Sequence, residues 1–265
     1  MPWEPPPIQT FYPIEFLREQ EHGRNKPLVI RCECDDENKD FVVKLWGSVE
    51  LGRDSLAKEI YGSLLANFFR IETPNFALVD IDIDFADIQP DPAIKARLQN
   101  SLGLNFGSEF IPGALMFNPP ASNALIALAA RVFCFDMLIG NVDRKMPKIN
   151  LFRKGDSLVV FDHELAFPFS RPATYIGGLP PAWECVKEPW AKDHILYNSL
   201  KGKDVGRELD QFFDDFLIFE DENLDKIEAQ IPGEWRNDVT QISTYLIEAR
   251  DNVARLKRSL QELLA

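Results

Sequence analysis

The first half of the chain carries a pattern of apolar and polar positions that predicts mainly strands. Residues 27–34 and 40–47 are rich in β-branched and aromatic side chains, and the acidic turn between them predicts an antiparallel hairpin. Further strands are expected within residues 71–81 and 105–117, because each holds a short apolar run bounded by turn-forming residues. The proline-rich residues 1–10 are expected to run extended along the surface.

Two helices are expected among these strands. Within residues 52–69 large apolar side chains recur every four positions, which gives the segment one apolar stripe and predicts a helix. Asp54 lies near its start and is expected to be its N-cap. A shorter helix is expected to start after Pro92, because proline is favoured in the first turn of a helix.

The second half of the chain has a different pattern, which predicts helices and one hairpin. Residues 121–140 are apolar on nearly all sides and predict a buried helix. Residues 149–162 predict two short strands joined by a turn at 153–156. Amphipathic patterns predict further helices at 206–219 and within 235–264.

These elements together predict an α+β fold. Residues 1–115 form a β-rich N-terminal part with one main helix, and residues 116–265 form a helical C-terminal part. Hydrophobic residues make up 45% of the 265-residue chain, which is enough to bury a sizeable core and excludes disorder for most of the chain.

The net charge and the length of the apolar stretches bear on whether the protein binds nucleic acid or a membrane. The formal net charge of −13 repels phosphate backbones, so we expect no direct contact with nucleic acid. The longest apolar stretch is interrupted by Arg131 and Asp136, and the N-terminus lacks the pattern of a signal peptide. We therefore expect a cytoplasmic protein without a membrane partner, and the four cysteines do not predict a disulfide framework.

Lys44 is the first polar residue that suggests chemistry. It ends a predicted strand whose two faces are both apolar, so it is expected to enter an interior, where a buried ammonium needs a partner. The next helix offers Glu59 beside its apolar stripe. A strand lysine paired with a helix glutamate holds nucleotide phosphates in protein kinases. The alternative is a lysine that reaches solvent and an unrelated, solvated glutamate.

A second group of polar residues lies in the apolar stretch 139–167. Asp143 follows the buried helix, Asn150 opens the predicted hairpin and Asp162 closes it. The hairpin brings the last two close together, and an amide oxygen with a carboxylate suits Mg²⁺. Asp143 can then accept a proton from a substrate hydroxyl. The alternative for Asp143 and Asn150 is a turn with side-chain-to-backbone hydrogen bonds.

The same residues carry a resemblance to a family. The runs "IGNVDRKMPKINLF" and "VVFDHELAF" resemble HipA-like kinases, whose bacterial members carry a Gly-Asn-x-Asp-Arg motif, a following asparagine and an Asp-His pair. The likeness extends upstream through "FVVKLWG" and covers roughly residues 20 to 170.

The resemblance implies a two-lobed, protein-kinase-like fold that uses ATP and Mg²⁺. It implies transfer of the γ-phosphoryl group to a hydroxyl, often a serine or threonine of a protein, so that a protein substrate is expected. Lys44 is then expected on the phosphates with Glu59 as its partner, Asp143 as the catalytic base, and Asn150 and Asp162 as metal ligands. Some relatives belong to toxin–antitoxin pairs, so an antitoxin or another regulatory partner is also possible.

The sequence departs from the kinase pattern in two places. Protein kinases place the metal-binding asparagine five residues after the base, where this chain has Lys148; Asn150 follows at seven. Only Gly23 lies between the first two predicted strands, so backbone amides near it are expected to replace a glycine-rich phosphate loop. Phe110 and Ile111, in the connection between the lobes, are expected to contact the nucleotide base.

Two polar residues beside the predicted ligands keep alternative interpretations. His163 either caps the strand end through a hydrogen bond or transfers a proton, and Arg144 pairs either with a carboxylate or with a phosphorylated loop residue. For the whole chain, the alternatives to a protein kinase are a small-molecule or lipid kinase and a catalytically weak or inactive interaction module.

Overall fold

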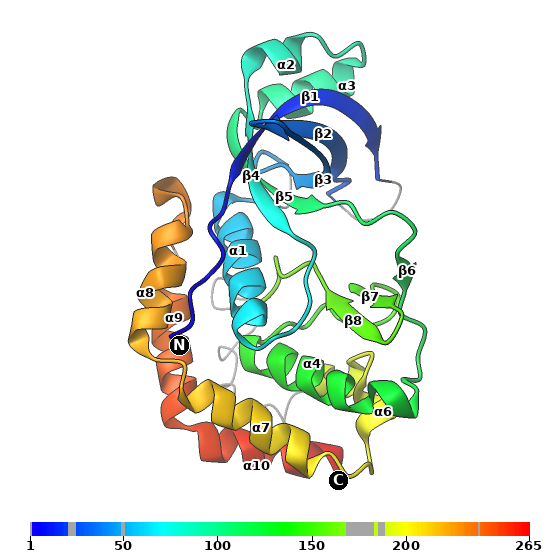
Figure 1. Cartoon of the computed structure of the whole chain (residues 1–265), viewed down its shortest axis with the longest axis vertical. Coiled ribbons are helices and arrows are strands. Elements are labelled where there is room, and N and C mark those ends of the chain that lie inside the picture. The colour runs from blue at the N-terminus through cyan, green and yellow to red at the C-terminus, as the bar shows by residue number, and fades with distance from the viewer. Residues whose placement is uncertain (1, 21–24, 49–50, 168–182, 185–188, 238) are drawn as a thin grey trace.

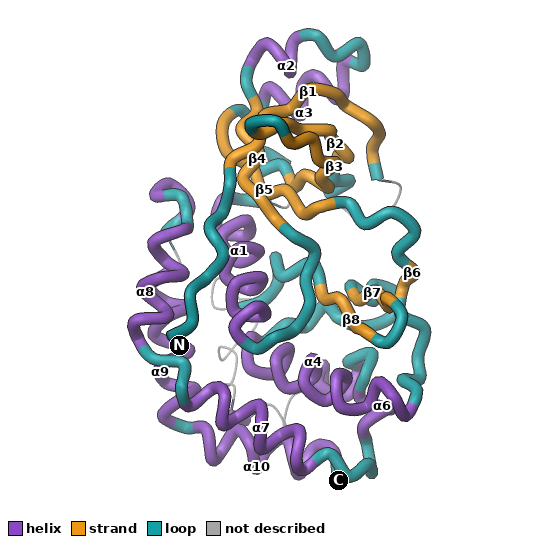
Figure 2. The backbone as a smooth tube through the Cα atoms, viewed as in Figure 1, coloured by secondary structure: helices purple, strands orange, loops and turns teal. Residues whose placement is uncertain are grey.

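The computed structural model describes residues 2–20, 25–48, 51–167, 183–184, 189–237 and 239–265. It has a mixed α+β fold with a β-rich N-terminal region and a helical C-terminal region, as predicted (Figures 1 and 2). None of the helices among the described residues is long and apolar enough to cross a membrane.

The N-terminal region is built around a closed five-stranded barrel with the strand order β1-β2-β3-β5-β4. Neighbouring strands are antiparallel except β1 and β4, which run parallel. The strands are β1 (Thr10–Glu19), β2 (Leu28–Cys34), β3 (Glu37–Lys44), β4 (Phe76–Ile81) and β5 (Gly103–Glu109). The sequence predicted β2–β5 at these places, but not the closure of the sheet.

Strand β1 is absent from the sequence prediction, which ended the extended segment at residue 10. Its sequence contains Pro13, and a proline within an apolar run argues against a strand because it cannot donate to the ladder. The structure accommodates the proline at an irregularity, since the pairing register with β2 shifts between Pro13 and Glu15. The ladder on either side of that shift closes the barrel.

Helix α1 (Arg53–Phe68) follows β3 and matches the predicted range. The prediction of Asp54 as its N-cap is wrong. The N-cap is Gly52, which makes no side-chain hydrogen bond, and Asp54 lies inside the first turn. The negative charge of its carboxylate still interacts favourably there with the positive end of the helix dipole.

Helices α2 (Ile83–Asp87) and α3 (Pro92–Gln99) lie at the outer end of the barrel, away from the helical region (Figure 1). Helix α3 begins at Pro92, as predicted, whereas α2 was not predicted. Their apolar side chains join those inside the barrel in one buried cluster, which includes Phe41, Val79 and Leu98. The barrel therefore has a hydrophobic core of its own.

The C-terminal region has a second, larger core. A short sheet of β6 (Leu115–Met116), β7 (Leu151–Lys154) and β8 (Ser157–Val160) lies against it. The helices are α4 (Ile126–Ile139), α5 (Pro189–Asp193), α6 (Tyr197–Leu200), α7 (Gly206–Leu217), α8 (Asp221–Gln230), α9 (Val239–Asp251) and α10 (Val253–Leu264), with 3-10 turns η1 (Asn123–Leu125) and η4 (Gly233–Trp235). The β7–β8 hairpin, α4, α7 and the last two helices were predicted.

Helix α1 belongs to this larger core. Its buried residues, such as Leu56 and Leu64, lie in the same apolar cluster as Phe135 of α4 and Phe212 of α7. In Figure 1 the helix runs from the barrel down into the helical region, alongside α8 and α9. The helix thus joins the strand that carries Lys44 to the core under the β7–β8 hairpin.

Candidate active site

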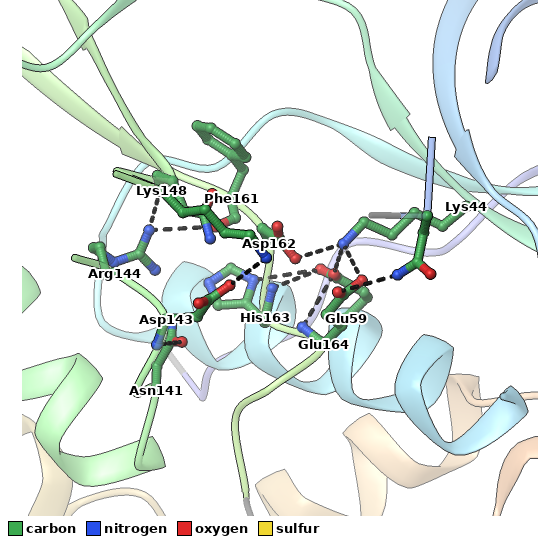
Figure 3. Close-up of polar contacts among 12 residues, drawn as sticks. Lys44, Glu59, Asn141, Asp143, Arg144, Lys148, Phe161, Asp162, His163 and Glu164 are labelled. Carbon is green, nitrogen blue, oxygen red and sulfur yellow. Dashed lines mark hydrogen bonds and ion pairs between the residues drawn. The ribbon is translucent and has the colours of Figure 1, made fainter. Parts of the chain in front are cut away.

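The ammonium of Lys44 is the centre of an ion cluster drawn from three parts of the chain (Figure 3). Its Nζ atom lies 2.5 Å from Glu59 Oε1, 2.6 Å from Asp162 Oδ1 and 2.8 Å from Glu164 Oε2. Lys44 ends β3 and Glu59 lies on α1, so the predicted strand–helix pair is present in the fold. Asp162 and Glu164 follow β8, more than 100 residues along the chain.

Glu59 is the most firmly held carboxylate of this cluster. Its oxygens accept the backbone N–H groups of His163, at 3.0 Å, and Glu164, at 3.1 Å. Burial on its own raises the pKa of Glu59, but the charge of Lys44 and the contact with His163 outweigh it and lower the pKa to about 2. Glu59 therefore anchors both the lysine and the segment that follows β8.

Lys44 stays charged in this buried place. Burial lowers the pKa of its ammonium, but the charges of Asp162, Glu59 and Glu164 outweigh that effect and leave the pKa above its ordinary value. The pKa of Glu164 moves in the opposite direction to that of Glu59. Burial and the neighbouring charges of Asp162 and Glu59 raise the pKa of Glu164 and outweigh the lowering effect of the lysine. Three carboxylates share one cation.

Asp143 lies on the loop after α4 and contacts a different lysine. Helix α4 ends at Gly140, whose left-handed backbone (φ 63°) turns the chain and favours glycine. The Asp143 backbone N–H donates to Asn141 Oδ1 at 3.4 Å, and its Oδ2 atom lies 3.3 Å from Lys148 Nζ. In the view of Figure 3, Asp162 lies between this pair and Lys44.

Asn150 and Asp162 lie at the two ends of the β7–β8 hairpin. The Asn150 carbonyl accepts the backbone N–H of Phe161 at 3.4 Å, which places Asn150 across from the residue before Asp162. Both residues have left-handed backbones, with φ of 47° and 64°. Asparagine and aspartate tolerate that conformation better than other residues with a side chain, which is a local reason for their presence here.

The oxygens at this place suit a hard divalent cation. Asn150 is buried, and its amide nitrogen, a hydrogen-bond donor, has no partner among the described residues. The atom with which this amide could ligate a cation is its oxygen. Asp162 adds a carboxylate next to it in the hairpin, and amide and carboxylate oxygens are ligands that Mg²⁺ prefers. The residues present therefore fit such an ion.

The buried side chain of Arg144 holds the β7–β8 hairpin in place through hydrogen bonds to its backbone. It is completely buried and pairs with Asp136 of α4, with 2.5 Å between Nε and Oδ2, while its Nη1 atom donates to the carbonyls of Asn150 and Phe161. His194 Nε2 lies 2.9 Å from the same Asp136 carboxylate. Of the two predicted alternatives, the carboxylate partner is the one in this structure.

Neither ring nitrogen of His163 has a hydrogen-bond partner among the described residues. The ring is buried, meets Phe135 edge to face with 5.9 Å between centroids, and has Nδ1 3.7 Å from Glu59 Oε2. The hydrogen bond at this strand end comes from the backbone N–H of His163 rather than from its ring.

Two of the other predicted nucleotide contacts, Phe110 and Ile111, lie in the connection that follows β5. The Phe110 N–H donates to the Asp40 carbonyl at 2.8 Å and extends the β3–β5 ladder, and the Ile111 carbonyl accepts from Ala114 at 3.3 Å. Neither residue has a hydrogen bond or ion pair to Lys44 in the part of the chain that the structure describes. Gly23 lies outside the described residues.

Sequence reasoning missed Glu164, Asp136 and His194 as members of the site. Asp136 had a usable signal, because a carboxylate within a helix that is apolar on nearly all sides must have a partner. Glu164 had only its position two residues after Asp162. Lys148 was noted as a departure from the kinase pattern, and its contact with Asp143 became visible only in the fold.

The sequence model of the HipA-like kinases matches residues 14–174, which is more than half of the 265-residue chain. The match includes the second part of β1, the Lys44 cluster, the Asp143 loop and the β7–β8 hairpin. No curated protein matches the chain.

Proposed function

Because the chain belongs to the HipA-like kinase family, we propose that it is an ATP-dependent kinase that transfers the γ-phosphoryl group to a hydroxyl, with a serine or threonine of a protein as the acceptor. The observation that carries this proposal is the pairing of Lys44 with Glu59 and Asp162. A strand lysine, a helix glutamate and an aspartate after the catalytic hairpin are the parts with which protein kinases hold ATP.

In this proposal Lys44 binds the phosphates and Glu59 holds its ammonium in position. Glu59 suits that task because two backbone N–H groups fix its carboxylate independently of the lysine. Its charge is also retained far below neutral pH, since its pKa is lowered to about 2 mainly by the lysine against the effect of burial. Positioning of this kind supplies most of the catalysis in phosphoryl transfer.

Asp143 is the proposed base that orients the acceptor hydroxyl. Its backbone N–H donates to Asn141, and the next residue, Arg144, is held by Asp136, so the loop has little freedom to move the carboxylate. Lys148, 3.3 Å from the Asp143 carboxylate, brings a cation to the same loop. Developing charge on a transferred phosphoryl group is stabilised by a nearby cation.

Asn150 and Asp162 are the residues that would hold Mg²⁺. When bound, the ion neutralises charge on the β- and γ-phosphates. The hydrogen bonds from Arg144 to the carbonyls of Asn150 and Phe161 tie the two ends of the hairpin together.

We extend the proposal to the arrangement of the chain. Residues 1–115 and 116–265 are taken as the two lobes of a kinase-like fold, with the nucleotide base near Phe110 and Ile111 and backbone amides near Gly23 on the phosphates. The proposed setting is cytoplasmic, with a protein substrate and an antitoxin or other regulatory protein as a partner, and without direct contact with nucleic acid. The net charge of −13 supports the last point.

Transfer of radiolabelled γ-phosphate from Mg-ATP tests the proposal. The purified chain is expected to label itself or to release phosphate, and Asp143→Asn is expected to lower that rate by at least about 100-fold, the usual contribution of a positioned base. Asp156→Asn, in the exposed turn of the same hairpin, is the matched control and is expected to retain the rate. Equal turnover by wild type and Asp143→Asn would mean that the chemistry lies elsewhere.

ATP binding, measured by thermal shift, separates the alternatives. The wild-type chain is expected to be stabilised by Mg-ATP, because a ligand that binds only the native state raises the melting temperature. Stabilisation without transfer to itself, to a protein panel or to small acceptors would instead indicate an inactive interaction module.

A further inference from the structure

Residues 2–9, which precede β1, have no role in the proposed function. In Figure 1 they run between α8 and α1 up to the barrel, where the chain continues into β1. We call them the N-terminal strap. The family model begins at residue 14 and ends at residue 174, so the strap and α8 both lie outside the match. Their contacts are therefore features of this chain that the family match does not account for.

Trp3 attaches the strap to the last turn of α1. Its ring meets that of Phe68 edge to face, with 5.5 Å between centroids, and lies 6.4 Å from that of Phe219, which precedes α8. Its Nε1 atom donates to Asn67 Oδ1 at 3.2 Å. Both Asn67 and Phe68 belong to α1, the helix that carries Glu59. This end of the strap is therefore fixed to an element of the proposed active site.

Helix α8 holds the strap at two further points. Lys226 Nζ donates to the Trp3 carbonyl at 3.1 Å and lies 2.8 Å from Glu4 Oε1. One turn later, Gln230 Oε1 accepts the backbone N–H of Ile8 at 2.8 Å. Residues four apart lie on one face of a helix, so this face of α8 follows the strap over most of its length. The side chain of Lys226 is only 19% exposed, so its contacts are screened less than those of an ordinary surface lysine.

The other end of the strap is hydrogen-bonded to the barrel. The Gln9 carbonyl accepts the backbone N–H of Leu78 at 2.9 Å, and the next two residues, Thr10 and Phe11, pair in parallel with β4. Phe11 lies in the apolar cluster inside the barrel, whereas Trp3 packs against the larger core of the helical region. One short segment thus connects both cores.

A cavity of about 580 Å³ lies beside the strap. Its lining includes residues 6–9 of the strap, residues 70–75 between α1 and β4, and side chains of the barrel such as Phe41 and Glu109. Rigid placement in proteins comes from close packing, and side chains do not interlock across a cavity. On this side of the molecule the position of the barrel therefore depends on the hydrogen bonds and ring contacts that hold the strap.

We propose that the N-terminal strap positions the barrel relative to the helical region, with Trp3 and Lys226 as positioning residues. This role rests on the proposed function, in which Lys44 at the end of β3 binds the phosphates and Asp162 after β8 holds the ion beside them. The barrel supplies Lys44 and the helical region supplies Asp162, so a shift of the barrel separates them. Trp3 and Lys226 act through the place of Lys44 rather than by contact with a substrate.

Two single substitutions are designed to release the strap. Lys226→Met removes the amine but keeps an unbranched apolar side chain, and Trp3→Ser removes the ring contacts. Exchange of the Ile8 N–H, followed by NMR, reports the release and is expected to become at least about tenfold faster, the effect of losing one hydrogen bond to a charged group. Circular dichroism checks that each variant is folded.

The reactivity of Lys44 toward acetic anhydride, measured by mass spectrometry, reports where the barrel lies without any need for catalysis. In wild type the Lys44 side chain is 14% exposed and contacts three carboxylates, so its amine is expected to react slowly. A displaced barrel exposes the amine and separates it from these charges, so labelling at about pH 8 is expected to rise at least about tenfold in both variants. Lys257 of α10, paired with Asp210 of α7, is the internal reference.

The kinetics of the proposed reaction are expected to follow the labelling. Lys226→Met is expected to lower kcat/KM for ATP roughly tenfold, since misplacement by about 1 Å can cost roughly 100-fold. Lys226→Arg keeps a cationic donor for the strap and is expected to restore slow labelling and most of the activity. Glu222→Gln removes another carboxylate partner of Lys226, 3.0 Å away on α8, and leaves the strap untouched. This control is expected to match wild type in both measurements.

The outcomes separate this inference from the proposed function. Fast Ile8 exchange with unchanged labelling of Lys44 overturns the inference and leaves the kinase proposal standing. Unchanged exchange in both variants overturns it as well, because Trp3 and Lys226 then do not hold the strap. Faster labelling in Glu222→Gln, equal to that in Lys226→Met, would assign the effect to the surface charge of α8 instead. Fast labelling of Lys44 in the variants of a chain that transfers no phosphate, even as wild type, supports the strap and contradicts the kinase proposal alone.

Discussion

The guanidinium of Arg144 and the carboxylate of Asp136 form an ion pair in which neither side chain has any solvent exposure. Two hydrogen bonds join the pair, from Nε to Oδ2 at 2.5 Å and from Nη2 to Oδ1 at 3.1 Å. The remaining Nη1 atom donates to the carbonyls of Asn150 and Phe161. The buried carboxylate of Asp136 on α4 thereby positions, through Arg144, the hairpin that carries two proposed metal ligands.

Removal of the Asp136 charge is predicted to destabilise the whole chain. Asp136→Asn leaves a buried guanidinium without a counter-charge, which costs about 3–5 kcal/mol of unfolding free energy. Urea denaturation at neutral pH measures the change. Asp215→Asn is the matched control, since its partner Arg131 is partly exposed, and a loss of at most about 1 kcal/mol is expected there. If the two variants lost equal unfolding free energy, breaking the buried pair would cost no more than breaking the partly exposed one, and the prediction would be wrong.

The same pair predicts how stability depends on acid. Burial raises the pKa of Asp136, but the charge of Arg144 and the hydrogen bond from His194 outweigh it and lower the pKa to about 2. Because the unfolded value is about 3.9, the carboxylate contributes stability at pH values above about 4 and loses it as the pH falls toward 2. That contribution is roughly 2 to 3 kcal/mol. The gap between wild type and Asp136→Asn in urea midpoints should therefore narrow over this range, and a constant gap would refute the assignment.

Lys44 and Glu59 are predicted to act as a unit in nucleotide binding. Glu59→Gln and Lys44→Met should each lower kcat/KM for ATP at least about tenfold, a loss of about 1.4 kcal/mol, and the double variant should lose little more than Lys44→Met. Lys39→Met, on the same strand β3 but paired with Glu37, should keep its activity. Additive losses in the double variant would show that the two residues work independently.

Gly62 of α1 is predicted to accept no larger residue. A Cβ atom there would lie 2.7 Å from both Cβ and Cγ of the buried His163, a distance that real contacts do not reach. His163 would have to move, together with Asp162 and Glu164 on either side of it. Gly62→Ala should therefore lower both the melting temperature and the affinity for Mg²⁺, although alanine is the better helix former. Gly206→Ala, at the open start of α7, should be neutral or slightly stabilising; a similar response at Gly62 would show that His163 yields easily.

Much of the fold could be read from local patterns. The β2–β3 hairpin, α1, the apolar helix α4 and the β7–β8 hairpin follow from short-range periodicity and turn residues, and all are present near their predicted bounds. Strand β1 was missed because Pro13 weakens its local signal, while its pairing with β2 and β4 is a long-range property. Closure of the barrel depends on those pairings and has no local signature.

The sequence by itself determined the chemical character of this protein: a lysine at the end of an apolar strand, a glutamate on the next helix, and aspartates with an asparagine around an apolar hairpin. Those residue types reveal themselves because polar groups in apolar surroundings are rare and costly. Only the tertiary structure decided how the charges are shared, with Glu164 as the third carboxylate on Lys44 and with Asp136 and His194 around Arg144. Electrostatic interactions depend on distance and burial, and segments more than 100 residues apart acquire both only when the chain folds.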